Sequence, residues 1–359
     1  MISKNIDSTN EQIIKEYENK ISTLPWIEKY RPKTFDDIVS HNITIKTLKK
    51  LITTKNLPHI LFYGPPGTGK TSTIMVCAKE LYGEYYDFMV MELNASDDRG
   101  IEVVRNKIKQ FVISQNVFFG KNTQERKNIF KLVILDETDA MTDDAQAILR
   151  KVIEKYTNNT RFCLICNYIK NINPALQSRC TKFRFAPLNY NNIKPYMLNI
   201  IKQEDINVTE CGINTIIKRA NGDMRKILNN LQSISIAYDI VDENIVNICL
   251  GYPSKEQMNF IITCLINDNF KNCYDKIIRI KKKFGLSISD IVYEIHDVFI
   301  NFIINNYSNE IIKNISIDHI KNILNKLRII EYNQSVNITE NIQLAAIIGI
   351  FKLYTKKKN

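Results

Sequence analysis

The sequence predicts an α/β domain built on a parallel sheet, followed by a chain that is helical to its C-terminal end. Three observations predict this fold class. Short apolar runs alternate with helix-like segments between residues 24 and 188, these runs are nearly uninterrupted, and the β pattern fades after Pro187. Such strands are expected where helices cover both faces of a parallel sheet.

The elements of this first region follow in chain order. The expected strands are HILFYG (59–64), FMVMELNA (88–95), FKLVILDE (130–137), RFCLICN (161–167) and FRFAPL (183–188). The expected helices are TSTIMVCAKELYG (71–83), GIEVVRNKIKQFVI (100–113) and AQAILRKVIEKY (145–156). Strands that alternate with helices in this way indicate crossover connections.

After residue 188 the sequence has helical spacing, which is broken at NGD (221–223) and at GYPS (251–254). We therefore expect domain boundaries near residues 188 and 252. Stretches such as 260–280 and 342–354 predict helices that are apolar enough to pack on each other or on a neighbour. A helical oligomerisation domain is expected there.

The composition and the N-terminal residues exclude several classes of protein. With 44% apolar and 24% charged residues, the chain is typical of a folded, soluble protein. Residues 1–22 are expected to form a polar tail, because they lack the pattern of a signal peptide. No uncharged apolar run reaches the roughly 18 residues of a membrane-spanning helix, so no membrane is expected as a partner. The net charge of +11 suits a polyanionic partner but does not identify one.

The eight cysteines are expected to be reduced thiols, because no secretory signal directs them to an oxidising compartment. Cys163 and Cys166 form a CxxC pattern, but they lie inside an expected buried strand, and no second pair stands at zinc spacing. We therefore expect two core residues there and no zinc site.

The segment GPPGTGKT follows the first expected strand and precedes a helix, which is the context that a phosphate-binding loop requires. The expected nucleotide-binding residues are Gly64, Pro65, Pro66, Gly67, Thr68, Gly69, Lys70, Thr71 and Ser72. Backbone N–H groups from 66 to 72 can surround the phosphates, helped by the helix N-terminus. Lys70 would reach the β and γ oxygens of ATP, and Thr71 would bind Mg²⁺.

Two carboxylates end the strand in KLVILDETD. Asp136 can support the metal, and Glu137 can polarise a water for attack on the γ-phosphorus. The alternative is a pair of solvated acids at a strand end. Another strand ends in Asn167, whose amide could hydrogen-bond the attacking water or the γ-phosphate if the two strands are neighbours.

Six segments, in this order, resemble the small subunits of replication factor C, the eukaryotic sliding-clamp loader of the AAA+ ATPase class. They are LPWIEKYRP (24–32), GPPGTGKT (64–71), LNASDDRG (93–100), LDETD (135–139), SRC (178–180) and GDMRK (222–226). The resemblance runs from about residue 24 to the C-terminus, and EKYRP and NASDDRG are specific to the family. The acidic motif reads DETD where many relatives have DEAD, although both carboxylates are kept.

The resemblance implies an AAA+ P-loop ATPase core at 23–188, a helical lid at 189–252 and an all-helical collar at 253–359. It implies ATP and Mg²⁺ as cofactors and a nuclear location. It also implies a hetero-pentamer with other replication factor C subunits, which uses ATP to load the sliding clamp PCNA onto primer–template DNA.

The resemblance also implies roles for single residues. Arg179 of SRC would act on the ATP of a neighbouring subunit, where its planar guanidinium spreads charge over the transferring phosphoryl oxygens. A structural arginine that pairs nearby is the alternative. Arg225 of GDMRK would contact the γ-phosphate from the lid. The residues expected around the adenine are Ile27, Arg31 and Val39.

Contacts to DNA are expected on the helix after NASDDRG, which faces the central channel in the family. The candidates are Arg99, Arg105 and Lys109, with Lys151 on a later helix. Arg105 and Lys109 are four residues apart and share a helix face, so they could follow phosphates without reading bases. A solvated charged face is the alternative.

Val117, Phe118 and Phe119 precede a polar, basic loop at 120–128. Adjacent aromatic side chains beside a loop can anchor a partner. We hypothesise that these three residues dock on the sliding clamp, with burial in the core of this chain as the alternative.

Two other functions stay open. The chain could be a nucleotide-binding structural subunit with little turnover that supplies Arg179 in trans. It could also be a helicase-type AAA+ motor, although such a motor needs a DNA-binding C-terminal module where this sequence has apolar helices. A mixed pentamer would indicate the loader, and a homo-hexamer the motor.

Overall fold

The computed structural model describes residues 24–96, 101–113, 130–305, 315–334 and 339–355. The chain divides into two compact units. The N-terminal unit comprises the residues up to Ile206 together with Ile216–Ser233, and the C-terminal unit comprises Asn207–Thr215 together with the residues from Ile234 onward.

A five-stranded parallel sheet forms the centre of the N-terminal unit. Its strands are β1 (Ile60–Tyr63), β2 (Val90–Asn94), β3 (Lys131–Asp136), β4 (Thr160–Cys166) and β5 (Thr181–Arg184). Their order is β2-β3-β4-β1-β5, and every neighbouring pair is parallel. The parallel sheet expected from the sequence is therefore confirmed, and the carboxyl ends of all five strands lie at one edge.

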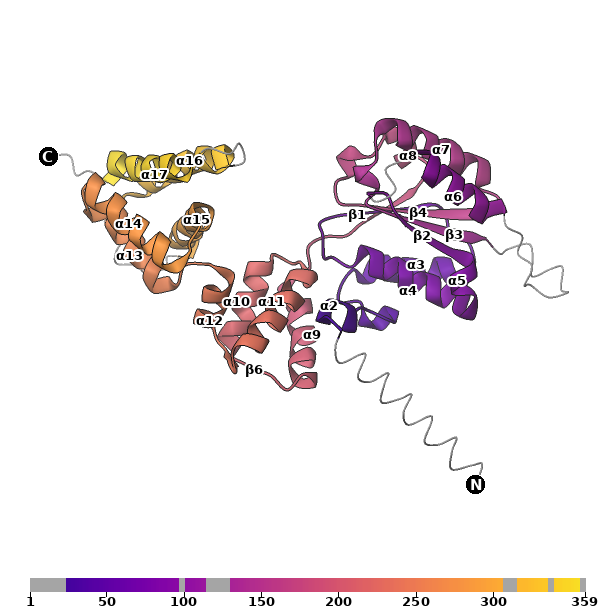
Figure 1. Ribbon diagram of the computed structural model, residues 1–359, viewed down its shortest axis with the longest axis horizontal. Helices are drawn as coiled ribbons and strands as arrows, with labels where there is room; N and C mark the ends of the chain where they lie inside the picture. Colours follow the sequence, from indigo (N-terminus) through magenta and orange to yellow (C-terminus); the bar gives the residue numbers. More distant parts are fainter. Residues whose placement is uncertain (1–23, 97–100, 114–129, 306–314, 335–338, 356–359) are drawn as a thin grey trace, which may run out of the picture. The chain divides into compact units, whose positions relative to one another are not determined.

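Helices cover both faces of this sheet (Figure 1). One face carries α3 (Asn42–Thr53), α4 (Lys70–Tyr82) and α5 (Tyr86–Met89), and the other carries α6 (Ile101–Ile113), α7 (Asp143–Tyr156) and α8 (Pro174–Gln177). Side chains alternate between the two cores along β1: Ile60 and Phe62 pack with Cys77 of α4, whereas Leu61 packs with Leu149 of α7. This alternation explains why the strand is apolar throughout.

Several expected boundaries differ from the structure. The last strand was expected at 183–188, but β5 runs from Thr181 to Arg184. Pro187 has no N–H to donate to a strand ladder, so the chain leaves the sheet before it. The expected helix at 71–83 forms as α4 and the one at 145–156 as α7, each with an earlier start.

The remaining elements of the N-terminal unit are short or follow the sheet. They are α2 (Trp26–Lys29), η1 (Phe35–Asp37), η2 (Gly83–Tyr85), η4 (Thr138–Ala140), η5 (Ile169–Asn171) and α9 (Tyr190–Gln203). Helices α10 (Glu210–Ala220) and α11 (Met224–Ala237) have residues in both units, and the chain breaks between them at the expected NGD segment.

The C-terminal unit consists mainly of helices. After the paired strands β6 (Asn207–Val208) and β7 (Ile240–Val241) come α12 (Glu243–Leu250), α13 (Lys255–Asn267), α14 (Phe270–Phe284), α15 (Ile288–Asn305), α16 (Ile317–Gln334) and α17 (Glu340–Thr355). The last five helices share one apolar core. The stretch 260–280 is two helices and not one, because the Asn269 side chain accepts from the N–H of Asn272 and starts α14.

The cysteines, the possible metal ligands and the helices of the described residues bear on metal binding and on membrane insertion. Cys163 and Cys166 lie on β4 and are buried, and burial raises the pKa of both thiols. Within the described ranges, no group of three or more His, Cys, Asp or Glu side chains is placed to hold a metal ion. None of the described helices is long and apolar enough to cross a membrane.

Candidate functional site

A cavity of about 420 Å³ opens at the carboxyl edge of the sheet. It lies between the loop after β1, the ends of β3 and β4, and the start of α11, all within the N-terminal unit. Fourteen of the residues named from the sequence line it: Ile27, Arg31, Val39, Pro66, Gly67, Thr68, Gly69, Lys70, Thr71, Ser72, Asp136, Glu137, Asn167 and Arg225. Its volume is in the range of small-molecule sites.

The loop at 64–69 has the backbone of an anion-binding turn. Gly69 has φ 91° and is the N-cap of α4, so the first N–H groups of that helix face the cavity without a side-chain cap. Gly67 has φ 67°, and a Cβ built on it would lie 1.7 Å from Oδ1 of Asp223. Only glycine allows both this backbone conformation and this close approach.

Lys70 is buried and makes three hydrogen bonds with its three ammonium protons. Its Nζ donates to the carbonyl oxygens of Gly64 (2.7 Å) and Pro65 (2.8 Å) and to Oδ1 of Asn167 (2.9 Å). Burial lowers the pKa of Lys70, while the nearby carboxylate of Asp136 acts in the opposite direction. Lys70 thus joins the start of α4 to Gly64, which follows β1, and to Asn167, which follows β4.

Asp136 connects the loop to the end of β3. Thr71 donates from Oγ1 to Oδ2 of Asp136 at 2.7 Å, and the N–H of Glu137 donates to Oδ1 at 2.8 Å. Glu137 is exposed and has a left-handed backbone, with φ 54° and ψ 36°. The hydroxyl and carboxylate oxygens are hard ligands of the kind that Mg²⁺ binds, so this pair fits a magnesium ion shared with phosphate.

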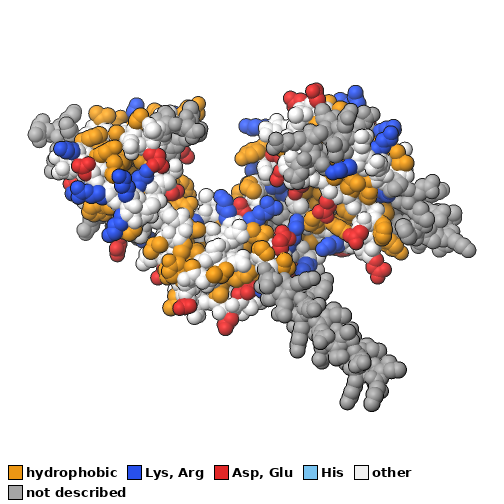
Figure 2. All heavy atoms as spheres, viewed as in Figure 1, with side chains coloured by type: hydrophobic (Ala, Val, Ile, Leu, Met, Phe, Trp, Pro, Cys, Tyr) orange, Lys and Arg blue, Asp and Glu red, His pale blue; other side chains and the backbone are white. Residues whose placement is uncertain are grey.

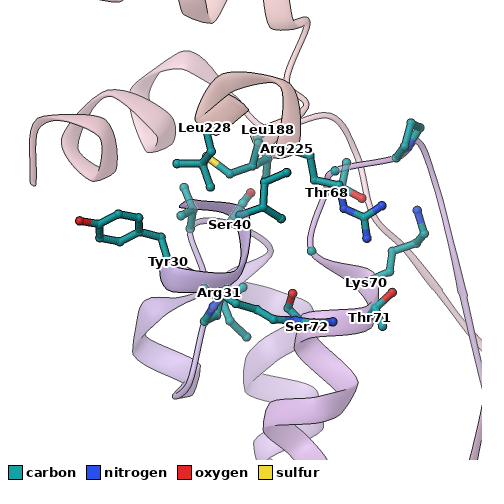
Figure 3. A pocket seen from close by; sticks show the side chains of 18 of the residues that line it. Tyr30, Arg31, Ser40, Thr68, Lys70, Thr71, Ser72, Leu188, Arg225 and Leu228 are labelled. Carbon is teal, nitrogen blue, oxygen red and sulfur yellow. The ribbon is translucent and has the colours of Figure 1, made fainter. Parts of the chain in front are cut away.

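The start of α11 borders the cavity and contacts the loop. The N–H of Met224 donates to the carbonyl of Gly67 at 3.1 Å. Oδ1 of Asp223 accepts from the N–H groups of Arg225 (2.9 Å) and Lys226 (3.3 Å), which caps the helix. Figure 3 shows the apolar side chains Leu188 and Leu228 on one side of the cavity and Lys70, Thr71 and Ser72 on the other, with the Arg225 side chain extending towards Thr68 and Lys70.

The segment around α2 is fixed to helix α9 beside the cavity. Lys29 donates from Nζ to Glu204 at 2.6 Å, and the hydroxyl of Tyr30 donates to the same carboxylate. The hydroxyl of Tyr196 donates to the carbonyl of Tyr30 at 2.7 Å. Burial, together with the bond to Glu204, raises the pKa of Tyr30. This network was not found from the sequence, because nothing local to residues 29 and 30 points to a glutamate 175 residues away.

The other residues named from the sequence do not line the cavity. Arg179 follows α8, is about half exposed and pairs with Glu154 of α7 at 2.8 Å. Lys109 on α6 and Lys151 on α7 are exposed. Arg105 lies on α6, but its side chain is outside the described part. The residues that lie wholly outside the described ranges are Arg99, Val117, Phe118 and Phe119.

Asp139, to which the sequence analysis gave no role, lies behind the cavity and contacts the backbone of Asn167. Its Oδ2 accepts from the N–H groups of Asn167 and Tyr168 at 3.1 and 3.0 Å. The available signal was the third acid of DETD, but its partner could be recognised only once β3 and β4 were known to be neighbours.

Comparison with known proteins matches residues 60–188 to the AAA family, the ATPases associated with various cellular activities, and residues 253–349 to the replication factor C C-terminal domain. The chain is 45% identical over 335 residues to replication factor C subunit 5 of Homo sapiens, which covers 93% of each chain. It is 40% identical over 334 residues to replication factor C subunit 3 of Saccharomyces cerevisiae, which covers 92% of this chain and 93% of the yeast protein. The RuvB Holliday-junction branch-migration motor of Thermotoga maritima has a TM-score of 0.49 at 16% identity, over 73% of this chain and 88% of that chain.

Proposed function

Since the chain belongs to the replication factor C family, we propose that it is an ATP-hydrolysing subunit of a clamp loader. In this proposal it joins other replication factor C subunits in a nuclear hetero-pentamer. ATP binding holds the sliding clamp PCNA open on primer–template DNA, and hydrolysis releases both. The proposal rests on two hydrogen bonds at one edge of the sheet: Lys70 donates to Asn167, and Thr71 donates to Asp136.

The cavity supports ATP as the ligand because it has an apolar part and a polar part. Ile27, Val39 and Leu228 supply apolar surface for a base, and the loop from 66 to 72 supplies N–H groups for phosphates. Lys70 would exchange some of its present acceptors for β and γ phosphate oxygens, which keeps its buried charge paired.

Thr71 and Asp136 would hold Mg²⁺, which, when bound, neutralises charge that develops on the phosphates. Glu137 is the candidate general base, because its carboxylate follows the strand end directly and is exposed at the cavity. Asn167 would orient the attacking water through its amide, which already contacts Lys70.

Arg179 is proposed to act on the nucleotide of a neighbouring subunit. Its guanidinium is half exposed outside the cavity of its own chain and is held by Glu154, which also accepts from Arg150 at 3.0 Å. An exposed pair of this kind contributes little stability, so a neighbour's phosphate could compete for the guanidinium. Hydrolysis would then depend on assembly.

Arg225 is proposed to couple nucleotide state to the position of the lid. It lies two residues after Asp223, which packs on Gly67, and its side chain enters the cavity. A γ-phosphate would attract this guanidinium and hold the start of α11 against the loop.

The contacts to DNA and to the clamp remain predictions. Lys109 and Lys151 are exposed and are proposed to meet phosphates. Arg99 and Arg105, whose side chains lie outside the described part, are proposed for the same role. On the visible face of the N-terminal unit, Lys and Arg side chains are interspersed with Asp and Glu (Figure 2). The DNA proposal therefore rests on where these residues lie in the assembly of the family, because the visible surface is not uniformly positive. Docking of Val117, Phe118 and Phe119 on the clamp is likewise proposed.

The test is DNA- and clamp-stimulated ATP hydrolysis by a loader reconstituted with this chain and related replication factor C subunits. Lys70→Ala in this chain should remove the turnover of its own site. Arg179→Ala should keep ATP binding by this chain and remove a different share of turnover. Arg150→Ala is the matched control, because it removes the other arginine on Glu154 and should leave turnover unchanged.

Two results would contradict the proposal. If Lys70→Ala abolishes ATP binding by this chain without any loss of turnover, the chain is a structural subunit. If Arg179→Ala behaves like Arg150→Ala, the arginine does not act in trans.

A further inference from the structure

Asp139 is the last acid of the DETD segment, and the proposed reaction leaves it without a role. Its Oδ2 accepts from the backbone N–H groups of Asn167 at 3.1 Å and Tyr168 at 3.0 Å. These two residues follow β4, beyond the last pairing of β3 with β4 at Leu135 and Leu164. One carboxylate oxygen therefore holds the chain where the sheet ladder has ended.

A tight turn after β3 directs Asp139 towards the end of β4. Glu137 adopts the left-handed conformation, and the N–H of Ala140 donates back to its carbonyl at 2.9 Å. Thr138 is buried and donates from Oγ1 to the carbonyl of Leu135 at 3.0 Å. These bonds fix the backbone of the turn relative to β3. The position of the Asp139 carboxylate therefore depends on the turn as well as on the rotamer of Asp139.

The segment that Asp139 holds carries the amide of Asn167, whose Oδ1 accepts from Nζ of Lys70 at 2.9 Å. Asp139 itself does not line the cavity. Any effect of Asp139 on the reaction must therefore pass through the backbone of Asn167 or through its negative charge. Misplacement of a reacting group by about 1 Å can slow a reaction by roughly 100-fold.

We propose that Asp139 is a positioning residue that fixes the backbone at Asn167 and thereby aims the Asn167 amide at the reacting phosphate. The inference rests on the proposed ATPase function. In this scheme Asp139, the third acid of the segment, holds the backbone in position, whereas Asp136 would bind the metal and Glu137 would act as the general base.

A crossed pair of substitutions separates geometry from charge. Asp139→Asn keeps an acceptor oxygen at the same distance from the backbone but removes the charge, whereas Asp139→Glu keeps the charge and displaces the acceptor by one methylene. The control is Asp144→Ala, which removes an exposed acid in the first turn of α7. Each variant is placed in this chain of the reconstituted loader, and the turnover of its site is defined as the share that Lys70→Ala removes.

The positioning role predicts that D139N keeps most of the kcat of this site, while D139E lowers it by about tenfold or more with little change in KM. D144A should match the unmodified chain. In an Asn167→Ala background D139E should cause no further loss, because the two residues act as one unit.

If D139E keeps the kcat of this site and D139N loses it, the charge of Asp139 matters and not its position, which would overturn the inference. Equal activity of all three Asp139 and Asp144 variants, or a full further loss in the Asn167→Ala background, would also overturn it. If Lys70→Ala removes no turnover at all, the proposed ATPase function fails and the inference fails with it.

Discussion

Gly67→Ala should separate the start of α11 from the phosphate loop. A Cβ at this position would lie 1.7 Å from Oδ1 and 2.4 Å from Cγ of Asp223, well below any van der Waals contact distance. The Asp223 side chain must therefore leave its capping position, and Cα of Asp223, 3.1 Å from the added methyl group, must yield as well, so we expect the hydrogen bond from Met224 to Gly67 to break. Gly69→Ala is the matched control, because Gly69 also has positive φ but no atom within 4 Å of the methyl group that alanine would add.

The magnitude follows from the contacts that each substitution changes. Both alanines adopt a left-handed backbone, which costs about 1–2 kcal/mol. Gly67→Ala also loses one backbone hydrogen bond, about 0.5–1.5 kcal/mol, and disturbs the Asp223 cap, which contributes about 1 kcal/mol. The backbone cost is common to both variants, so we expect Gly67→Ala to lower the free energy of unfolding by about 1.5–2.5 kcal/mol more than Gly69→Ala does.

Hydrogen–deuterium exchange of the nucleotide-free chain gives a local measurement of the same effect. In Gly67→Ala the amides at 223–228 should exchange faster than in the unmodified chain, whereas in Gly69→Ala they should not. Equal exchange at 223–228 in the two variants, together with equal unfolding free energies, would refute the account of this contact.

Three further predictions concern other parts of the N-terminal unit. Glu137→Gln should lower ATP turnover by about 10²–10⁴-fold while leaving calorimetric ATP affinity intact, whereas Lys70→Ala should weaken the affinity itself; equal affinity losses would contradict these roles. Glu204→Ala removes the shared acceptor of two side chains around α2 and should lower the unfolding free energy by about 1.5–3 kcal/mol, against less than about 1 kcal/mol for Glu28→Ala in an exposed pair. Burial, with a nearby guanidinium, lowers the pKa of His59 to about 4 from its ordinary 6.5, so the unfolded chain takes up a proton first and stability falls as pH drops from about 6.5 to 4. In denaturation experiments over this pH range, the free energy of unfolding of His59→Gln should fall less steeply than that of the unmodified chain. An equal slope in the two proteins would show that His59 is not the cause of the pH dependence.

Much of the N-terminal unit could be predicted because its signals are local. The apolar runs and the glycine-rich turn each depend on residues close in the chain, and the five strands form within a few residues of their expected positions. Helix α3 (Asn42–Thr53) was not singled out, because it lies before the first strand, outside the alternation. The break at Asn269 was missed because a single capping residue outweighed a long apolar pattern.

The candidate site was predicted as a set of residues but not as a geometry. The phosphate loop fixes its own residues, since Lys70 and Thr71 follow the turn directly. The sequence did not identify the contacts of Asp139 with Asn167, of Asp223 with Gly67 or of Glu204 with the α2 segment. Each of these contacts joins residues that are remote in the chain, and no local preference encodes them.

By itself, the sequence determined which segments become strands and helices and which loop can bind phosphate, because hydrophobic periodicity and turn chemistry act between neighbouring residues. Only the tertiary structure decided that β4 lies between β1 and β3. This strand order brings Asn167 to Lys70, 97 residues away, and to Asp139 of the adjacent strand end. Strand order depends on which arrangement of strands and helices buries the most apolar surface. This is a property of the whole packed chain and not of any one segment.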